Sequence, residues 1–441
     1  MPLSSEAGPR AHDIEALQRE AEAVADDVSA ALRLAARLTA GDELHNASQS
    51  TLHSILAAVA EGSAMAARVV EPHIDALAIL AECPDPVDLD AVGADAHSTW
   101  GVFAAESGDT RLDAREQNGR WTLDGLKPWC SLADRLSHAL VTAHTPEGRR
   151  LFAVDLSAGV TAHPEAWVAR GLPGVTSGPA DFALVPALPV GEAGWYLERP
   201  GFEWGGIRVA ACWTGAARGI ARRVQDAAAH RDTDLLWLHA GRAEAALYTA
   251  ELALHAAATA IDAPRRESDA EAGRQGDGAP RLVPGGPATQ RRTPAQLAQL
   301  TRSVVREACE SVLREAAHAL GPAPAALDPW FAAQTSDLAL YLLQDHGDRD
   351  LARLGRLSAP SAPRTATTPT TTTSGSSTST TRSTSNTPAT PNTPTTPSVP
   401  TTSATPSASS TPSTPSTPSL PNDSSMPNAS SGPSRAAGAR A

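Results

Sequence analysis

The chain has 441 residues, which is room for two or three domains, and a formal net charge of −13 at neutral pH. Because nucleic-acid binding depends on neutralising phosphates, this acidic balance excludes a general nucleic-acid binder. The N-terminal residues lack the apolar core of a signal peptide, and no apolar run approaches the ~20 residues of a membrane span, so we expect a cytoplasmic protein with no membrane partner. The four cysteines are scattered without a CxxC pair, which predicts neither structural disulfides nor a metal site.

Residues 1–94 are predicted to form an N-terminal helical domain. Apolar residues recur at three- and four-residue spacing over residues 14–38 and again over residues 50–67, which indicates amphipathic helices. The second helix is expected to continue to Pro72 and to be interrupted there, because a proline disfavours the helical conformation of the preceding residue. Helix is expected again over residues 73–80.

Residues 95–200 are predicted to form a β-domain. Asn118-Gly119 and Asp124-Gly125 are typical turn formers, and the β-prone residues between them indicate paired antiparallel strands. The apolar run at residues 139–142 suits the interior of a barrel or sandwich. We therefore expect an antiparallel β-barrel or β-sandwich.

Residues 201–357 are predicted to form a C-terminal four-helix bundle. Small residues recur at the start of its first helix, at Ala210, Gly215 and Gly219, and predict a close approach of neighbouring helices. Thr293 is a candidate N-cap, followed by Pro294 at a favoured first-turn position. The long helical patterns begin at residues 201–219 and continue at residues 235–261, 294–320 and 328–345.

Two segments are expected to be disordered. Residues 264–292 form a charged loop rich in Gly and Pro, of a length that is rarely ordered inside compact domains. The tail of residues 358–441 is mostly Ser, Thr and Pro, and it cannot bury enough apolar surface to offset the entropy of ordering. The predicted fold class is therefore α+β, mainly α, with a disordered Ser/Thr/Pro tail.

Four motifs follow one another in the predicted β-domain. They are residues 106–109 (ESGD), 119–127 (GRWTLDGLK), 129–131 (WCS) and 141–143 (VTA). In type and order these motifs resemble the acyl-CoA dehydrogenase family, of which the chain looks like a divergent member. The resemblance implies a three-part fold of helices, β-domain and helical bundle. It also implies an FAD-dependent oxidoreductase of fatty acid metabolism, commonly a homo-oligomer, that oxidises the alpha-beta CH–CH bond of an acyl-CoA-type thioester.

The resemblance assigns cofactor-binding roles to residues of these motifs. A flavin ring needs an aromatic or apolar wall and donors aimed at the ring edge that becomes electron-rich. Trp129 is implied to lie against the ring, and the hydroxyl and backbone N–H of Ser131 to donate near its N5 atom. Ser107, and Thr176 or Ser177, match further cofactor-contacting positions. The alternatives are a core tryptophan beside a turn serine, and an ordinary acidic turn at Ser107.

Dehydrogenation of an acyl thioester also needs a carboxylate that removes the proton alpha to the carbonyl. When residues 336–338 (SDL) are laid on the family's Arg-Asp-Ala, Asp345 falls on the position of the catalytic Glu, so the resemblance implies Asp345 as the base. Asp is one methylene shorter, and a displacement of about 1 Å can lower the rate on the order of 100-fold. The alternative is that Asp345 belongs to a solvated, charged helix end with Asp348 and Asp350.

Arg231 is the one candidate for the family's diphosphate contact, which a neighbouring subunit supplies; a lone arginine at a helix end is otherwise simply solvated. Two further functions therefore stay open. A flavin monooxygenase of the same fold does not need the carboxylate base. A non-catalytic relative that acts as a binding or scaffold subunit would explain the incomplete diphosphate contact.

Overall fold

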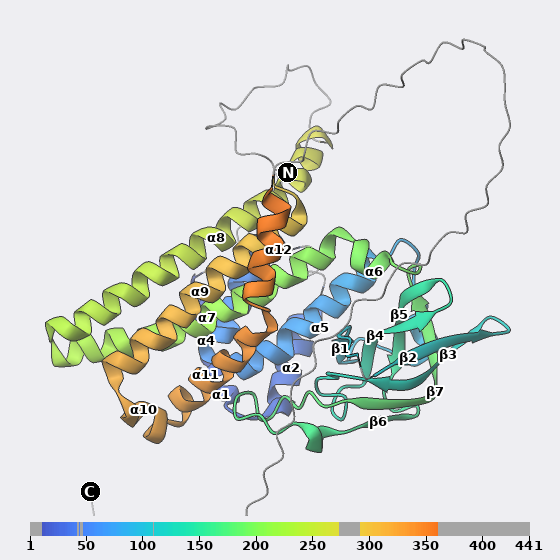
Figure 1. Cartoon of the computed structure of the whole chain (residues 1–441), viewed down its shortest axis with the longest axis horizontal. Coiled ribbons are helices and arrows are strands. Elements are labelled where there is room, and N and C mark those ends of the chain that lie inside the picture. The colour runs from blue at the N-terminus through green and yellow to red at the C-terminus, as the bar shows by residue number, and fades with distance from the viewer. Residues whose placement is uncertain (1–10, 42–43, 45–46, 109, 273–291, 360–441) are drawn as a thin grey trace, which may run out of the picture. The chain divides into compact units, whose positions relative to one another are not determined.

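A computed structural model of the chain describes residues 11–41, 44, 47–108, 110–272 and 292–359 (Figure 1). Within them the elements follow the predicted order of helices, strands and helices. The described residues belong to one compact unit. Asp109, residues 273–291 of the predicted loop and residues 360–441 of the predicted tail lie outside the described residues.

The single helix predicted over residues 14–38 is wrong, because two helices occupy this segment. They are α1 (Ala11–Val24) and α2 (Val28–Leu38). Ala25 between them has a φ of 50°, and the carboxylate of Asp27 accepts a hydrogen bond from the Ala30 N–H at 3.0 Å. An aspartate that caps the first N–H groups of α2 stabilises a new helix start more than it stabilises a continued helix.

The break predicted at Pro72 lies at Ser63 instead, between α4 (Gln49–Gly62) and α5 (Ala64–Glu82). Ser63 has extended backbone, and its hydroxyl accepts from the Ala66 N–H at 3.1 Å, which makes it the N-cap of α5. Pro72 lies inside α5 and removes only the helical bond to the carbonyl of Arg68. Contacts of α5 with α2, α4, α7 and β1 hold the helix through this point.

The β-domain contains one mixed sheet. As predicted, Asn118 and Gly119 form the turn between two antiparallel strands, β2 and β3, and both have positive φ, 54° and 76°. The second predicted turn, at Asp124-Gly125, is wrong, because both residues lie inside β3, where the pairing with β7 shifts register between Leu123 and Gly125. The strands are β1 (Trp100–Phe103), β2 (Leu112–Gln117), β3 (Arg120–Lys127), β4 (His138–Thr145), β5 (Gly148–Asp155), β6 (Val160–Ala162) and β7 (Ala180–Val190). A short helical turn, η1 (Leu89–Val92), precedes them, and η2 (Pro164–Ala166) follows β6.

The strand pairings return to their starting point. β2 pairs with β3, β3 with β7, β7 with β5, β5 with β4, and β4 with β2 through Asp113 and His144. β1 extends the sheet beside β4. The sequence indicated an antiparallel sheet. The sheet is instead mixed, because β1 and β2 run parallel to β4. Its interior side chains include Leu123, Phe152 and Val185, all buried.

The C-terminal part begins with α6 (Trp195–Glu198), α7 (Pro200–Arg231) and α8 (Asp234–Ala272). The prediction that a loop begins at residue 264 is wrong, because α8 continues to Ala272. The residues after Pro264 are mostly Arg, Glu, Asp and Ala, several of which favour helix, and a proline removes only one backbone donor. Then follow α9 (Pro294–Leu320), α10 (Pro322–Leu327), α11 (Pro329–Tyr341), η3 (Leu342–Gln344) and α12 (Asp348–Ser358).

Helix α7 packs closely on α4, as its small residues predicted. A Cβ atom on Gly215 would lie 2.0 Å from the carbonyl oxygen of Ala57, and one on Gly219 would lie 2.6 Å from that of Glu61. Helices α7, α8 and α9 lie side by side (Figure 1). The predicted cap is also confirmed, because the Thr293 hydroxyl accepts from the Gln296 N–H at the start of α9.

The loop before β7 is fastened to α11. The Leu172 N–H donates to the buried carboxylate of Asp337 at 2.5 Å, and burial raises the pKa of Asp337 to about 6. A Cβ atom on Gly171 would lie 2.1 Å from the Ser336 carbonyl oxygen, so only glycine permits this approach. The β-domain loop over residues 167–178 is therefore held against the C-terminal helices.

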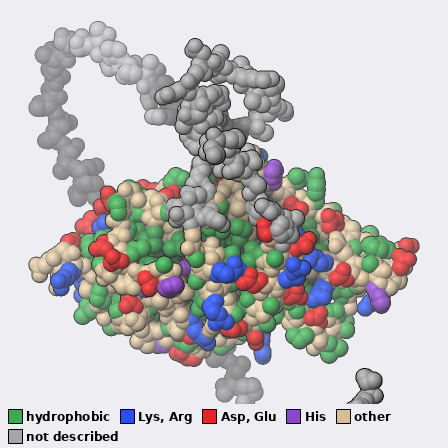
Figure 2. Space-filling view, turned by 180° about the vertical axis from the view of Figure 1, so that it is seen from behind, with side chains coloured by type: hydrophobic (Ala, Val, Ile, Leu, Met, Phe, Trp, Pro, Cys, Tyr) green, Lys and Arg blue, Asp and Glu red, His purple; other side chains and the backbone are tan. Residues whose placement is uncertain are grey.

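No helix in the described ranges is long and apolar enough to cross a membrane. On the face shown in Figure 2, acidic and basic side chains are interspersed and are not separated by sign.

Candidate active site

The loop that follows β3 carries the first predicted site residues in a strained backbone. Trp129 and Leu132, on either side of Cys130 and Ser131, have φ of 59° and 58°, values that non-glycine residues seldom adopt. The indole of Trp129 is 57% exposed, so it is not a core tryptophan. Backbone strain beside an exposed aromatic ring is typical of functional sites.

Hydrogen bonds bring the other predicted hydroxyl residues to this loop. The Leu132 N–H donates to the Thr176 carbonyl at 2.7 Å, and the Ser131 and Ser177 hydroxyl oxygens lie 2.8 Å apart. The Thr176 hydroxyl donates to Asp134 at 3.2 Å. The structure therefore brings together Trp129, Ser131 and both of the residues proposed at 176–177.

Arg68 of α5, which sequence reasoning missed, also reaches this cluster. Its guanidinium donates to the Ser131 hydroxyl oxygen at 3.0 Å. Both side chains line a small pocket of about 20 Å³, which is room for about one water molecule and not for a larger ligand. The Ser131 hydroxyl therefore has two partners in this structure, the Arg68 guanidinium and the Ser177 hydroxyl.

Arg68 also lines a cavity of about 410 Å³, a size typical of small-molecule sites. Residues of α5, α7, α9 and α12 and the residues that follow β1 form its wall. The wall is charged. Its ion pairs join Asp75 with Arg208 at 3.0 Å, Glu203 with Arg353 at 3.4 Å, Asp350 with His346 at 3.6 Å, and Arg199 with Glu82 at 2.5 Å.

Asp345, the predicted base, lies between η3 and α12 beside this cavity but does not line it. Its carboxylate is buried, 3.6 Å from the Arg302 guanidinium and 3.9 Å from that of Arg306. One oxygen accepts from the Gly347 N–H at 2.9 Å, and the other has no hydrogen-bond partner. Asp345 is therefore a buried, ion-paired residue and does not belong to a solvated helix end.

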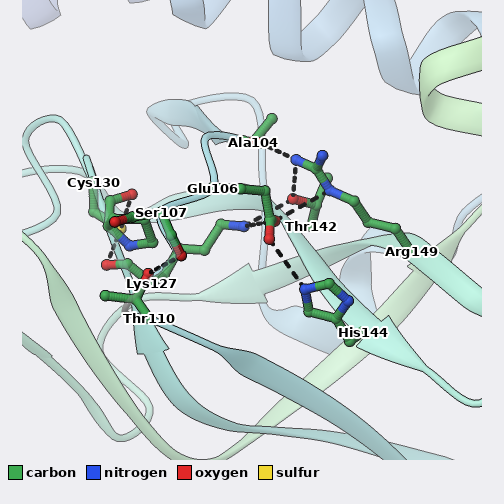
Figure 3. Close-up of polar contacts among 10 residues, drawn as sticks. Ala104, Glu106, Ser107, Thr110, Lys127, Cys130, Thr142, His144 and Arg149 are labelled. Atoms are coloured by element: carbon green, nitrogen blue, oxygen red, sulfur yellow. Dashed lines mark hydrogen bonds and ion pairs between the residues drawn. The ribbon is translucent and has the colours of Figure 1, made fainter. Parts of the chain in front are cut away.

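Ser107 follows β1 in a turn that a buried ion pair holds in place (Figure 3). The ammonium of Lys127, whose side chain is 2% exposed, donates to Glu106 and to the Thr142 hydroxyl, both at 2.9 Å. Burial lowers the pKa of Lys127, and the Glu106 carboxylate opposes this. Arg149 lies 3.2 Å from the same carboxylate. The Ser107 carbonyl accepts from the Thr110 N–H, which closes the turn.

Arg231 is exposed at the C-terminal end of α7. That end lies away from the strands, whereas the N-terminal end of α7 lies beside them (Figure 1). Within one chain Arg231 does not join Trp129 and Ser131. Among the described residues, no group of three or more His, Cys, Asp or Glu side chains is placed to hold a metal ion.

A larger cavity of about 660 Å³ lies between α4, α5, α7 and α8. None of the predicted site residues lines it, and its wall includes Leu44 and Ala47, which flank residues outside the described part of the chain. We therefore place the candidate site at the charged cavity beside Arg68.

The fold, with helices before and after a β-domain, is shared with known solved structures. No protein-family model matches the sequence, and no curated protein matches it. Sequence identities to the solved structures are low, so the similarity described next is a similarity of fold only.

The dibenzothiophene monooxygenase of Paenibacillus sp. A11-2 is similar over 78% of this chain and 95% of its own, with a TM-score of 0.60 and 17% identity. KijD3, solved with FMN and dTDP-3-amino-2,3,6-trideoxy-4-keto-3-methyl-D-glucose, is similar over 78% and 91%, with a TM-score of 0.62 and 16% identity. The nitrososynthase of Micromonospora carbonacea var. africana is similar over 80% and 97%, with a TM-score of 0.60 and 16% identity.

Proposed function

We propose that the chain is a flavin-dependent oxidoreductase. The observation that carries the proposal is the position of Arg68, which joins the two halves of the site. It lines the cavity and at the same time donates to Ser131, the hydroxyl next to the exposed Trp129. Support comes from the solved structures of the same fold, among them KijD3 with FMN and the FMN-bound dibenzothiophene monooxygenase.

The residues around this loop suit a flavin ring. When bound, a flavin supplies the redox chemistry, and the protein supplies orientation and electrostatics. The exposed indole of Trp129 offers an aromatic face, and Ser131 offers a hydroxyl that can donate to the ring edge once Arg68 withdraws. Arg231 could contact the diphosphate of FAD only from a neighbouring chain of a homo-oligomer, whereas FMN has no diphosphate and does not use this contact.

The absorbance spectrum of the purified protein tests this proposal. A yellow protein that releases FMN or FAD on denaturation is expected, and the mass of the released compound identifies which. A protein that stays colourless after incubation with both flavins would contradict the proposal and favour a non-catalytic binding or scaffold subunit.

Replacing Trp129 with Ala is expected to weaken flavin binding about tenfold, because the ring loses its aromatic partner. The measurement is the amount of flavin bound per protein chain at one fixed concentration of free flavin. Trp237→Ala is a matched control, since Trp237 is a similarly exposed tryptophan, on α8. Equal flavin contents in the two variants would remove Trp129 from the site.

Between the two oxidations, the geometry favours a flavin monooxygenase. Abstraction of a proton requires a base within hydrogen-bond reach of the substrate, and the carboxylate of Asp345 faces Arg302 and Arg306. Acyl-CoA dehydrogenation with Asp345 as the base is the second candidate. It is favoured by the unpartnered oxygen of Asp345 and by its neighbours Gln344 and His346, which line the cavity.

Asp345→Asn separates the two reactions. In a dehydrogenase, an acyl-CoA bleaches the bound flavin in the absence of oxygen. The rate of this bleaching is expected to fall by a factor of about 100 or more in the variant, because an amide does not accept the proton. A monooxygenase is bleached only by an external reductase and then consumes oxygen, and the variant keeps this behaviour. Asp348→Asn, at an exposed position on α12, is the control.

A further inference from the structure

Glu71 is an acidic residue of the cavity wall, and the proposed redox chemistry gives it no role. It lies on α5 one turn after Arg68, its side chain is 94% buried, with 6% exposed, and it lines the cavity. Within the described residues its carboxyl has neither a hydrogen bond nor an ion pair. The other carboxylates of the wall, Asp75, Glu203 and Asp350, each have a basic partner.

A buried carboxyl without a partner is stable only in its neutral form. Burial and the nearby Asp75 carboxylate raise the pKa of Glu71 to about 8, although Arg68, Arg208 and Arg302 oppose this. Glu71 therefore carries a proton at neutral pH and is a hydrogen-bond donor. The titratable and charged groups that face it are Arg68 and Asp75 of α5, Cys212 and Arg208 of α7, Arg302 of α9 and Tyr341 of α11.

With Glu71 neutral, the cation of Arg68 has no carboxylate partner among the described residues. The guanidinium has five N–H donors, and the Ser131 hydroxyl is its one hydrogen-bond acceptor there. Its planar donor pairs match a carboxylate in shape and charge. Arg68 and Glu71 together therefore offer an anion both a cation and a neutral donor.

Unpaired polar atoms around the cavity add to this picture. The Trp213 Nε1 and one Asp345 oxygen are buried without hydrogen-bond partners, although that oxygen lies 3.6 Å from the Arg302 guanidinium. The Arg302 guanidinium lies over the Trp213 ring at 4.8 Å, and that of Arg68 over the Tyr341 ring at 5.8 Å, so both rings pack against arginines of the cavity wall.

We propose that the cavity binds a small polar substrate through its carboxylate or a comparable anionic group, which Arg68 binds as it leaves Ser131, while the neutral Glu71 donates a hydrogen bond to the same group. The inference rests on the proposed function in one respect, that this cavity is the substrate site.

Calorimetry on the flavin-free chain tests the proposal with butyrate and its uncharged analogue butyramide as probes. Butyrate is expected to bind below neutral pH at least about tenfold more tightly than butyramide, because it pairs with a charged group. The affinity for butyrate is expected to fall as the pH rises through about 8, since ionised Glu71 repels the anion.

Two variants identify the residues responsible. Glu71→Gln keeps a neutral donor, so it is expected to bind butyrate without the loss at alkaline pH. Arg68→Gln is expected to abolish the preference for butyrate over butyramide. The control Glu251→Gln makes the same Glu-to-Gln change at an exposed position on α8. It is expected to keep both the preference for butyrate and the loss of affinity at alkaline pH.

The proposal is overturned if butyrate does not bind at millimolar concentration, if butyramide binds as tightly, or if Glu71→Gln keeps the alkaline loss. These measurements need no flavin. Failure of the proposed redox function, seen as a colourless protein, is therefore distinguishable from failure of the anion site.

Discussion

Acidification from neutral pH to about pH 4 is expected to lower the free energy of unfolding by about 3 kcal/mol for each of two buried histidines, His53 and His73. Burial lowers the pKa of each imidazole from 6.5 to about 4. Each pH unit of difference between the folded and unfolded values corresponds to about 1.4 kcal/mol. Between pH 6.5 and about pH 4 the unfolded chain binds more protons than the folded chain, so the free energy of unfolding falls as the pH falls through this range. Above pH 6.5 both histidines are neutral in both states and do not affect stability.

The contacts of both rings explain why they stay neutral in the folded chain. Nδ1 of His73 accepts from the Trp100 N–H at 3.1 Å, so the proton lies on Nε2, which donates to the Thr39 hydroxyl oxygen at 2.9 Å. Protonation of Nδ1 breaks the bond to Trp100. His53 is 5% exposed, neither of its ring nitrogens has a partner, and the nearby charge of Arg208 opposes a second cation.

Urea unfolding followed by tryptophan fluorescence at a series of pH values measures this effect. His53→Leu is expected to remove about half of the acid loss and to stabilise the chain at neutral pH, because two unpaired nitrogens leave the core. His73→Asn is expected to remove the other half, since its amide oxygen can replace Nδ1 as acceptor. His255→Asn, at an exposed position on α8, is the control. An unchanged acid loss in the double variant His53→Leu/His73→Asn would show that other groups are responsible.

Features set by neighbouring residues could be predicted from the sequence. The turn at Asn118 and Gly119 depends on their own φ values, and the cap at Thr293 depends on a hydroxyl three residues before the amide it bonds. The small residues of α7 indicated a close helix contact, although not that α4 is the partner. Trp129 and Ser131 lie in one three-residue motif, so the sequence could place them close together, but their roles at a flavin stay a prediction.

The central residues of the site could not be predicted in this way. Arg68 and Glu71 occur in a helical pattern in which charged residues are usually solvated, and only the docking of α5 on β1 brings Arg68 to Ser131. The burial of Asp345 depends on Arg302 and Arg306 of α9, which the spacing of η3 and α12 does not reveal. The break at Ser63 was missed because the local signal of Pro72 was taken as decisive, whereas the serine cap and the packing of α5 outweigh it.

Replacing Glu106 with Gln is expected to lower the free energy of unfolding by about 2 kcal/mol, because it leaves the buried ammonium of Lys127 without a counter-charge. A broken buried ion pair costs about 3–5 kcal/mol, and the effect is smaller here because the Glu106 side chain is 35% exposed. Urea unfolding at neutral pH measures the loss. Asp113→Asn, on β2, breaks an exposed ion pair with Arg111 and is expected to change the free energy of unfolding by less than about 1 kcal/mol.

The double variant Glu106→Gln/Lys127→Met determines whether an uncompensated charge causes this loss. Met fills a volume similar to that of the Lys side chain and needs no counter-charge, so the double variant is expected to be more stable than Glu106→Gln alone. Burial opposes ionisation of Glu106, but Lys127 and Arg149 hold its pKa below the ordinary value of 4.5. The pair therefore stabilises the chain above that value and ceases to do so as the pH falls through the lowered pKa. If the double variant were less stable than Glu106→Gln, the hydrogen bond from Lys127 to Thr142 would be the main contribution of the network.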